Sequence, residues 1–94
     1  MALTLAPLAS PTAAQDLSVG RSLATRWCMA CHVVEPEQTM ATDNAPSFRA
    51  IASRPGTTPE TLDRYLSRSH TLMPDFMLSL QERNALVAYI LSLR

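Results

Sequence analysis

Apolar residues recur at the three- and four-residue spacing of a helix in several segments of this chain, and no segment alternates regularly between apolar and polar residues as a strand would. The first such segment covers residues 16–30. Its apolar positions are Leu17, Leu23, Ala24 and Trp27. Asp16 is a candidate N-cap, because its side-chain oxygen can accept hydrogen bonds from the free N–H groups of the first turn. The pattern therefore predicts a first helix over residues 16–30.

Two shorter helices are predicted in the middle of the chain by their start and stop signals. The first covers residues 47–53, has Asn44 as a candidate cap and ends before the Pro-Gly pair at residues 55–56. The second begins at the Thr-Thr-Pro-Glu sequence of residues 57–60, where one threonine caps the helix and the proline suits its first turn. This helix is expected to run to about residue 69.

Ser79 and Glu82 have the spacing of a capping box and predict the start of the last helix. Its apolar inner face consists of Leu86, Tyr89, Ile90 and Leu93. Because all the regular patterns are helical, the sequence predicts an all-α fold of about four helices.

Composition indicates one folded domain without a surface suited to nucleic acid. Of the 94 residues, 47% are apolar and 17% are charged, which is too apolar for a disordered chain. The eight basic residues are all arginine and are balanced by eight acidic residues, so neither nucleic-acid binding nor a polybasic membrane anchor is expected. The longest strongly apolar stretch, residues 86–90, is too short for an integral membrane span.

The first 14 residues carry no charge and consist mainly of Ala, Leu, Pro and Thr. Two interpretations stay open for residues 1–14. They are the remainder of a secretory signal peptide, with a small-residue cleavage site at residues 12–14, or a disordered extension. Both interpretations place the folded domain at residues 15–94.

The two cysteines and a histidine lie together in the sequence Cys28-Met29-Ala30-Cys31-His32. A disulfide between them would close a ring too small to stabilise the domain much. A zinc site lacks a second pair of regularly spaced ligands, and a thioredoxin-like redox pair needs a βαβ context. The C-x-x-C-H spacing is instead typical of covalent haem attachment, in which both thiols bond the haem and the histidine ligates the iron. Haem c is therefore favoured among the four interpretations.

The chain resembles the class I c-type cytochromes, which are small monohaem electron carriers. The resemblance rests on the C-M-A-C-H pentapeptide, on Gly20 eight residues before Cys28, on the Met73-Pro74 pair and on a final helix that contains Tyr89. It implies a cytochrome c fold, in which about four helices pack around one covalently bound haem. Glycine costs about 1 kcal/mol relative to Ala inside a helix. Close packing of the terminal helices at Gly20 and Tyr89 would explain why that cost is tolerated.

The resemblance also implies the residues of the haem site. Cys28 and Cys31 would hold the haem through thioether bonds, and His32 would be the first axial ligand of the iron. The carbonyl of Pro46 would accept a hydrogen bond from the other ring nitrogen of His32. Met73 is the favoured second ligand because it matches the family's Met-Pro pair and because a following proline stiffens the backbone.

Alternatives stay open at two points of this site. The other candidates for the second axial ligand are Met77, Met40 and His70. The candidate donors to the haem propionates are Arg49, Arg54, Tyr65 and Trp27.

The expected function is transfer of single electrons between redox proteins by a monomeric, periplasmic or otherwise exported cytochrome. The expected partners are a dehydrogenase, an oxidase or a cytochrome complex. No acid–base pair or nucleophile stands out in the sequence, so no enzymatic activity is expected. The alternatives are a cytochrome subunit bound permanently to a dehydrogenase or oxidase, and an enzyme or gas sensor with an open position on the iron.

Overall fold

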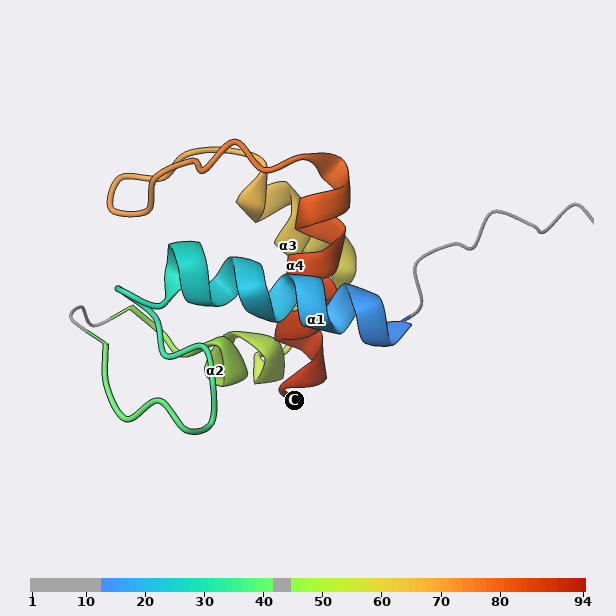
Figure 1. Ribbon diagram of the computed structural model, residues 1–94. Coiled ribbons are helices and arrows are strands. Elements are labelled where there is room, and N and C mark those ends of the chain that lie inside the picture. Colours follow the sequence, from blue (N-terminus) through green and yellow to red (C-terminus); the bar gives the residue numbers. More distant parts are fainter. Residues whose placement is uncertain (1–12, 42–44) are drawn as a thin grey trace, which may run out of the picture.

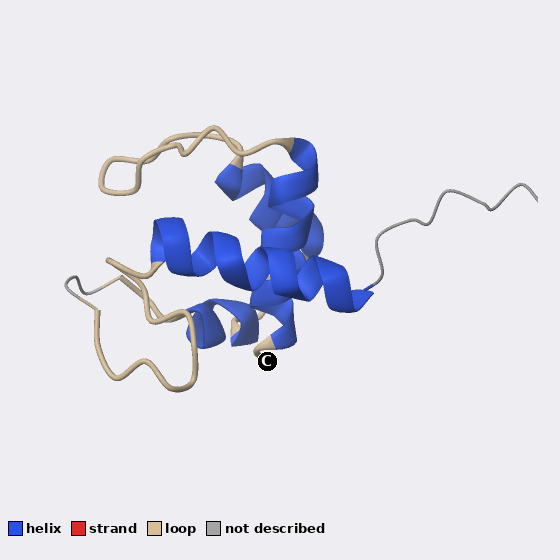
Figure 2. Cartoon of the chain, in the orientation of Figure 1, coloured by secondary structure: helices blue, strands red, loops and turns tan. Residues whose placement is uncertain are grey.

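The structure, a computed structural model, describes residues 13–41 and 45–94, and every regular element in this part of the chain is a helix (Figure 2). The elements in chain order are α1 (Ala13–Leu23), η1 (Ala24–Cys28), α2 (Phe48–Ser53), α3 (Pro59–Leu66) and α4 (Leu80–Ser92). The all-α prediction is therefore confirmed for the described residues. An N-terminal extension is expected at residues 1–14. Residues 1–12 of it lie outside the described residues.

Helices α1 and α4 cross each other and make the main helix–helix contact of the fold (Figure 1). Gly20 lies buried at the crossing, where a Cβ atom would stand 2.7 Å from Cβ of Tyr89 and closer still to the carbonyl oxygen of Ala85. Only a residue without a side chain allows this approach. The expected packing of the terminal helices at Gly20 and Tyr89 is thus confirmed.

The hydrophobic core gathers around α4 and receives residues from η1, α2 and α3 and from the loop after η1. Its buried members are Ala24, Cys28, Val34, Phe48, Ala52, Leu62, Leu86, Val87, Tyr89 and Ile90. Inside it, the hydroxyl of Tyr89 donates a hydrogen bond of 2.6 Å to the carbonyl oxygen of Val34. This bond fixes the loop after η1 to α4, because the carbonyl would otherwise be buried without a partner.

The starts of three helices have side-chain caps. Ser79 and Glu82 form the predicted capping box at the start of α4. At α3, Thr58 is the cap and forms a capping box with Thr61. At α2, the side chain of Ser47 accepts from the N–H of Ala50 at 3.1 Å. Ser47 thus provides the N-cap hydrogen bond of α2. The predicted cap, Asn44, lies outside the described residues.

Two predictions about helix limits are wrong. The first helix begins at Ala13, so Asp16 lies within its first turn instead of capping it, where its charge still favours the helix dipole. Helix α3 ends at Leu66, short of the predicted residue 69. Its C-cap Ser67 has a φ of −87° and a ψ of 2°, outside helical geometry, while its N–H still donates to the carbonyl oxygen of Asp63. The chain is thereby free to form the loop of residues 67–79.

Two loops extend from the helices on the same side of the fold, one on either side of the end of η1 (Figure 1). They are the loop that follows η1 and the loop of residues 67–79 between α3 and α4. The first contains Cys31 and His32, and the second contains Met73. The helices therefore bring both loops, and with them these predicted site residues, to one side of the molecule. None of the helices in the described part combines the length and the apolar character that crossing a membrane requires.

Candidate functional site

The first helix changes its winding just before the cysteine pair. Residues 24–28 form a π-helical turn, in which the N–H of Met29 donates to the carbonyl oxygen of Ala24 at 3.0 Å. Such a turn holds more residues than an α turn and occurs frequently at functional sites. It alters the direction of the residues that follow Ala24, so Trp27, predicted on the helix's apolar face, is 46% exposed. Cys28 ends the turn with its side chain buried.

The backbone turns back sharply after Cys28. The N–H groups of Cys31 and His32 both donate to the carbonyl oxygen of Cys28, at 3.2 and 2.9 Å. The two thiols are free, Cys28 being buried and Cys31 partly exposed. Burial raises the pKa of the Cys28 thiol to about 11, and the neighbouring Cys31 adds to the rise.

The imidazole of His32 is oriented by two groups. Its Nδ1 lies 2.6 Å from the carbonyl oxygen of Pro46, and its ring centre lies 5.4 Å from that of Phe48 with a tilt of 51°. A carbonyl oxygen can only accept a hydrogen bond, so Nδ1 carries the proton. In the neutral ring the lone pair is then on Nε2, which is the nitrogen that can ligate a metal ion.

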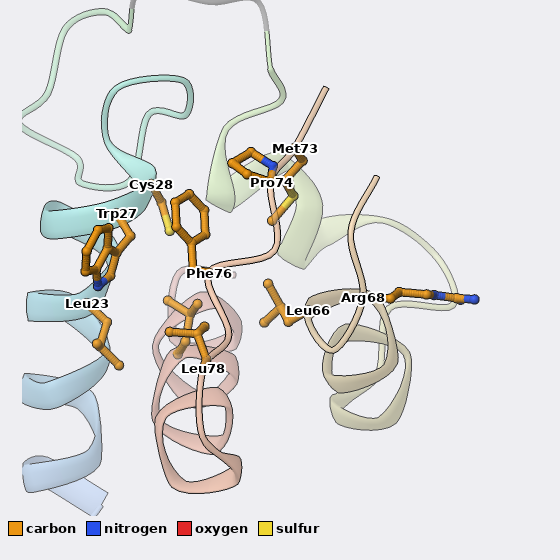
Figure 3. Close-up of a pocket in the computed structure, with 10 residues that line it drawn as sticks. Leu23, Trp27, Cys28, Leu66, Arg68, Met73, Pro74, Phe76 and Leu78 are labelled. Atoms are coloured by element: carbon orange, nitrogen blue, oxygen red, sulfur yellow. The ribbon is translucent and has the colours of Figure 1, made fainter. Parts of the chain in front are cut away.

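A mostly apolar pocket lies between η1, the end of α3 and the loop of residues 67–79 (Figure 3). Its lining residues are Leu23, Trp27, Cys28, Leu66, Arg68, Met73, Pro74, Phe76, Leu78 and Leu86. Cys28 and Met73 thus line the same space although they are far apart in the sequence. Arg68 is the one charged lining residue, and its side chain extends away from the others (Figure 3).

The other ligand candidates lie elsewhere. Met77 is 86% exposed and has a positive φ of 55°, and Met40 is 77% exposed. The ring of His70 stacks on that of Tyr65. Of the four candidates, Met73 is the one that lines the pocket with Cys28.

A protein family described as cytochrome c oxidase, cbb3-type, subunit III matches residues 15–90. The chain belongs to this cytochrome c family. A protein of Bradyrhizobium diazoefficiens named cytochrome c-552 is 42% identical over 94 residues, which make up 100% of this chain and 90% of that protein. No solved structure matches the chain.

Membership of the family establishes the cofactor and the general function. The cytochrome carries covalently bound haem c and transfers electrons, so it is an electron carrier and not an enzyme. Its partners are redox proteins, and cytochrome c domains are typically exported. The resemblance to small monohaem cytochromes that the sequence suggested is confirmed.

The residues of the cytochrome fit this cofactor. Two thiols precede an imidazole whose Nδ1 is bonded to a backbone carbonyl and whose Nε2 makes no such bond, and a thioether lines the pocket that Cys28 also lines. The pocket walls are apolar, as a porphyrin face requires. Among residues 13–41 and 45–94, no group of three or more His, Cys, Asp or Glu side chains is arranged to hold a metal ion.

The four candidate propionate donors are spread over the cytochrome. Trp27 lines the pocket, and Tyr65 lies in the last turn of α3 without being one of the lining residues. Arg49 lines a separate hollow with Val34 and Leu93, and Arg54 is the C-cap residue directly after α2. The structure thus does not bring the four together.

Two residues of the site went unnoticed in the sequence. The ring of Phe76 lies 5.6 Å from that of Trp27 and closes the pocket between η1 and the loop of residues 67–79. Gln38 accepts a hydrogen bond from the N–H of Val34 and donates to the carbonyl oxygens of Met29, His32 and Met40. An aromatic residue two positions after Pro74 was a signal for Phe76, whereas a lone glutamine in a loop gave none.

Proposed function

We propose that Cys28 and Cys31 attach one haem through thioether bonds and that His32 and Met73 fill the two axial positions of its iron. The observation that carries this proposal is the orientation of His32. The Pro46 carbonyl accepts a hydrogen bond from Nδ1, so the lone pair of the neutral ring is on Nε2, directly after the cysteine pair. Met73 lines the pocket that Cys28 enters, which supports its role as the second ligand.

Each of these residues has a definite task in electron transfer. The haem iron supplies a one-electron couple between its ferrous and ferric forms. The hydrogen bond to Pro46 fixes the plane of His32 and increases the electron density at Nε2. The thioether of Met73 favours ferrous iron, so a His/Met pair gives a higher reduction potential than two histidines would. With both positions filled by side chains, no position is left for a substrate on the iron.

The axial assignment is tested by two matched variants of the haem-loaded protein. Met73→Ala should abolish the weak red absorption band of sulfur-to-iron ligation, lower the reduction potential and allow the ferrous form to bind carbon monoxide rapidly. Met77→Ala serves as control, since Met77 is 86% exposed, and it should leave all three properties unchanged. Loss of the band in the Met77 variant alone would overturn the assignment and move the ligand to Met77. Rapid carbon monoxide binding by the unaltered protein would favour the enzyme or gas sensor with an open iron.

We further propose that the protein is a mobile, monomeric carrier in the periplasm. Similarity over the whole chain to a protein named cytochrome c-552 supports this view. The family to which the chain belongs is described as subunit III of a cbb3-type oxidase, which supports the second candidate, a subunit held permanently in an oxidase. Gentle fractionation of cells distinguishes the two candidates, because a mobile carrier is released as a monomer with the periplasmic contents. Recovery only with a membrane-bound oxidase would favour the subunit.

A further inference from the structure

The loop that contains Met73 is folded back on itself by a tight turn. The N–H of His70 donates to the carbonyl oxygen of Met73 at 3.0 Å, and the N–H of Met73 donates to that of His70 at 3.3 Å. Residues 71 and 72 form the tip between them. Leu72 is 92% exposed, so the turn is not held in place by burial of its tip. Another contact must fix it to the body of the protein.

The side chain of His70 provides that contact. Its ring stacks on the ring of Tyr65 with a centroid distance of 3.6 Å and an angle of 10° between the planes. Its Nε2 lies 3.1 Å from the carbonyl oxygen of Tyr65, to which it donates. One imidazole therefore joins the turn to the last residues of α3 through a ring contact and a hydrogen bond.

The helix that receives His70 is itself well anchored. Leu62 buries the inner side of α3 in the core, and Asp63 forms an ion pair of 2.9 Å with Arg83 of α4. Arg83 also donates to the carbonyl oxygen of Leu78 at 2.9 Å, which fixes the other end of the loop. The loop is thus tied at its end by Arg83 and near its start by His70.

We propose that His70 is a positioning residue for Met73, acting through its stack on Tyr65. This inference rests on the proposed role of Met73 as axial ligand. Two hydrogen bonds fix the backbone of Met73 to His70, and the ring of His70 fixes that pair to α3. Without the ring, the turn can move as a unit while its internal hydrogen bonds persist. The thioether would then spend more time away from the iron.

The experiment compares haem-loaded variants at His70 and Tyr65. His70→Ala and Tyr65→Ala each remove the ring contact, whereas His70→Phe retains a planar ring and loses only the hydrogen bond from Nε2. The readouts are the rate of carbon monoxide binding to the ferrous protein, the weak red band and the reduction potential. Tyr89→Phe is the control, because it removes a hydrogen bond within the core, away from this loop.

We expect carbon monoxide to bind about three- to tenfold faster to His70→Ala and Tyr65→Ala, which corresponds to the loss of one aromatic pair. The red band should weaken and the potential should fall in the same two variants. His70→Phe should recover most of the original rate. The double variant that combines His70→Ala and Tyr65→Ala should bind carbon monoxide no faster than either single variant, because both substitutions remove the same contact. Tyr89→Phe should lower the melting temperature and leave the rate unchanged.

Two results would overturn the inference, and they are distinguishable from failure of the ligand assignment. Unchanged binding rates in His70→Ala, with a Met73→Ala variant that loses the band, would reject His70 alone. Equal increases in His70→Ala and in the Tyr89→Phe control would reduce His70 to a contributor to general stability. If Met73→Ala keeps the band, the ligand assignment fails, and the positioning role fails with it.

Discussion

At the scale of the residue, a single amide organises the loop after the cysteine pair. The Nε2 group of Gln38 lies 3.1 Å from the carbonyl oxygens of Met29, His32 and Met40, and its Oε1 accepts from the N–H of Val34 at 2.9 Å. The loop contains little regular structure of its own. One side chain therefore bonds four backbone groups of this loop and helps to hold the residues around His32 in place.

Gln38→Glu tests this function with almost no change in shape. A carboxylate cannot donate, so three carbonyl oxygens would face a negative charge in place of an N–H group. We expect the free energy of unfolding to fall by about 1–3 kcal/mol, measured by urea denaturation of the haem-loaded protein. The matched control is Gln81→Glu in the first turn of α4, where an added negative charge should be neutral or slightly stabilising. Equal stability of the two variants would contradict the role of Gln38.

The hydroxyl of Tyr89 is a second residue with a specific partner. It donates to the carbonyl oxygen of the fully buried Val34, and burial raises the pKa of this phenol. Tyr89→Phe leaves that carbonyl without a partner, so we expect a loss of about 1–3 kcal/mol in the free energy of unfolding. Tyr65→Phe, at a half-exposed ring, is the matched control and should change stability little. A Tyr89→Phe variant as stable as the control would show that the bond contributes nothing.

At the scale of the element, the position of α1 on α4 depends on the absence of one side chain. Gly20 lies where any Cβ would collide with the backbone of Ala85 and with Tyr89. The crossing places η1, and therefore Cys28, beside the pocket. The geometry of the haem site thus depends on how closely two helices approach.

Gly20→Ala should therefore destabilise the protein although alanine is the better helix former. Overpacking costs about 1–3 kcal/mol, while the gain in helix propensity is about 1 kcal/mol. We expect a lower melting temperature, followed by circular dichroism. Val19→Ala, at the exposed neighbouring position, should be neutral or stabilising. A rise in melting temperature for Gly20→Ala would mean that the helices separate without cost.

At the scale of the whole molecule, the balance of charges determines how partners approach. Eight arginines and eight acidic residues give the polypeptide a net charge of zero. Long-range attraction toward a charged partner is correspondingly weak. Recognition must then depend on short-range contacts around the site.

The rate of electron exchange should consequently depend little on salt. The two relevant rates are the rate of reduction by a cationic inorganic complex and the rate of oxidation by an anionic one. Each rate should change with ionic strength by well under the roughly tenfold that strong steering produces. Stopped-flow absorbance at low and at physiological ionic strength measures both rates. A steep fall with salt for one complex alone would reveal a surface patch of one sign and contradict the prediction.

The sequence by itself determined the local features of this protein. Helix starts at Thr58 and Ser79 follow from side-chain oxygens that bond N–H groups three residues away. The C-x-x-C-H spacing indicated haem attachment for the same reason, since the chemistry is contained in five consecutive residues. The cost of Gly20 inside a helix predicted a close approach. All of these features depend on residues that are close in the sequence, or on the local free-energy cost of one residue type within a helix.

Only the tertiary structure decided which distant residues share the site. The pocket joins Cys28 to Met73, and the carbonyl of Pro46 meets the imidazole of His32 across a loop. The π-helical turn that directs Cys28 and the stack of His70 on Tyr65 gave no signal in the residue pattern. These contacts form because α1 packs closely on α4 and thereby fixes where two irregular loops begin. Their directions depend on packing between elements, which no local spacing of residues encodes.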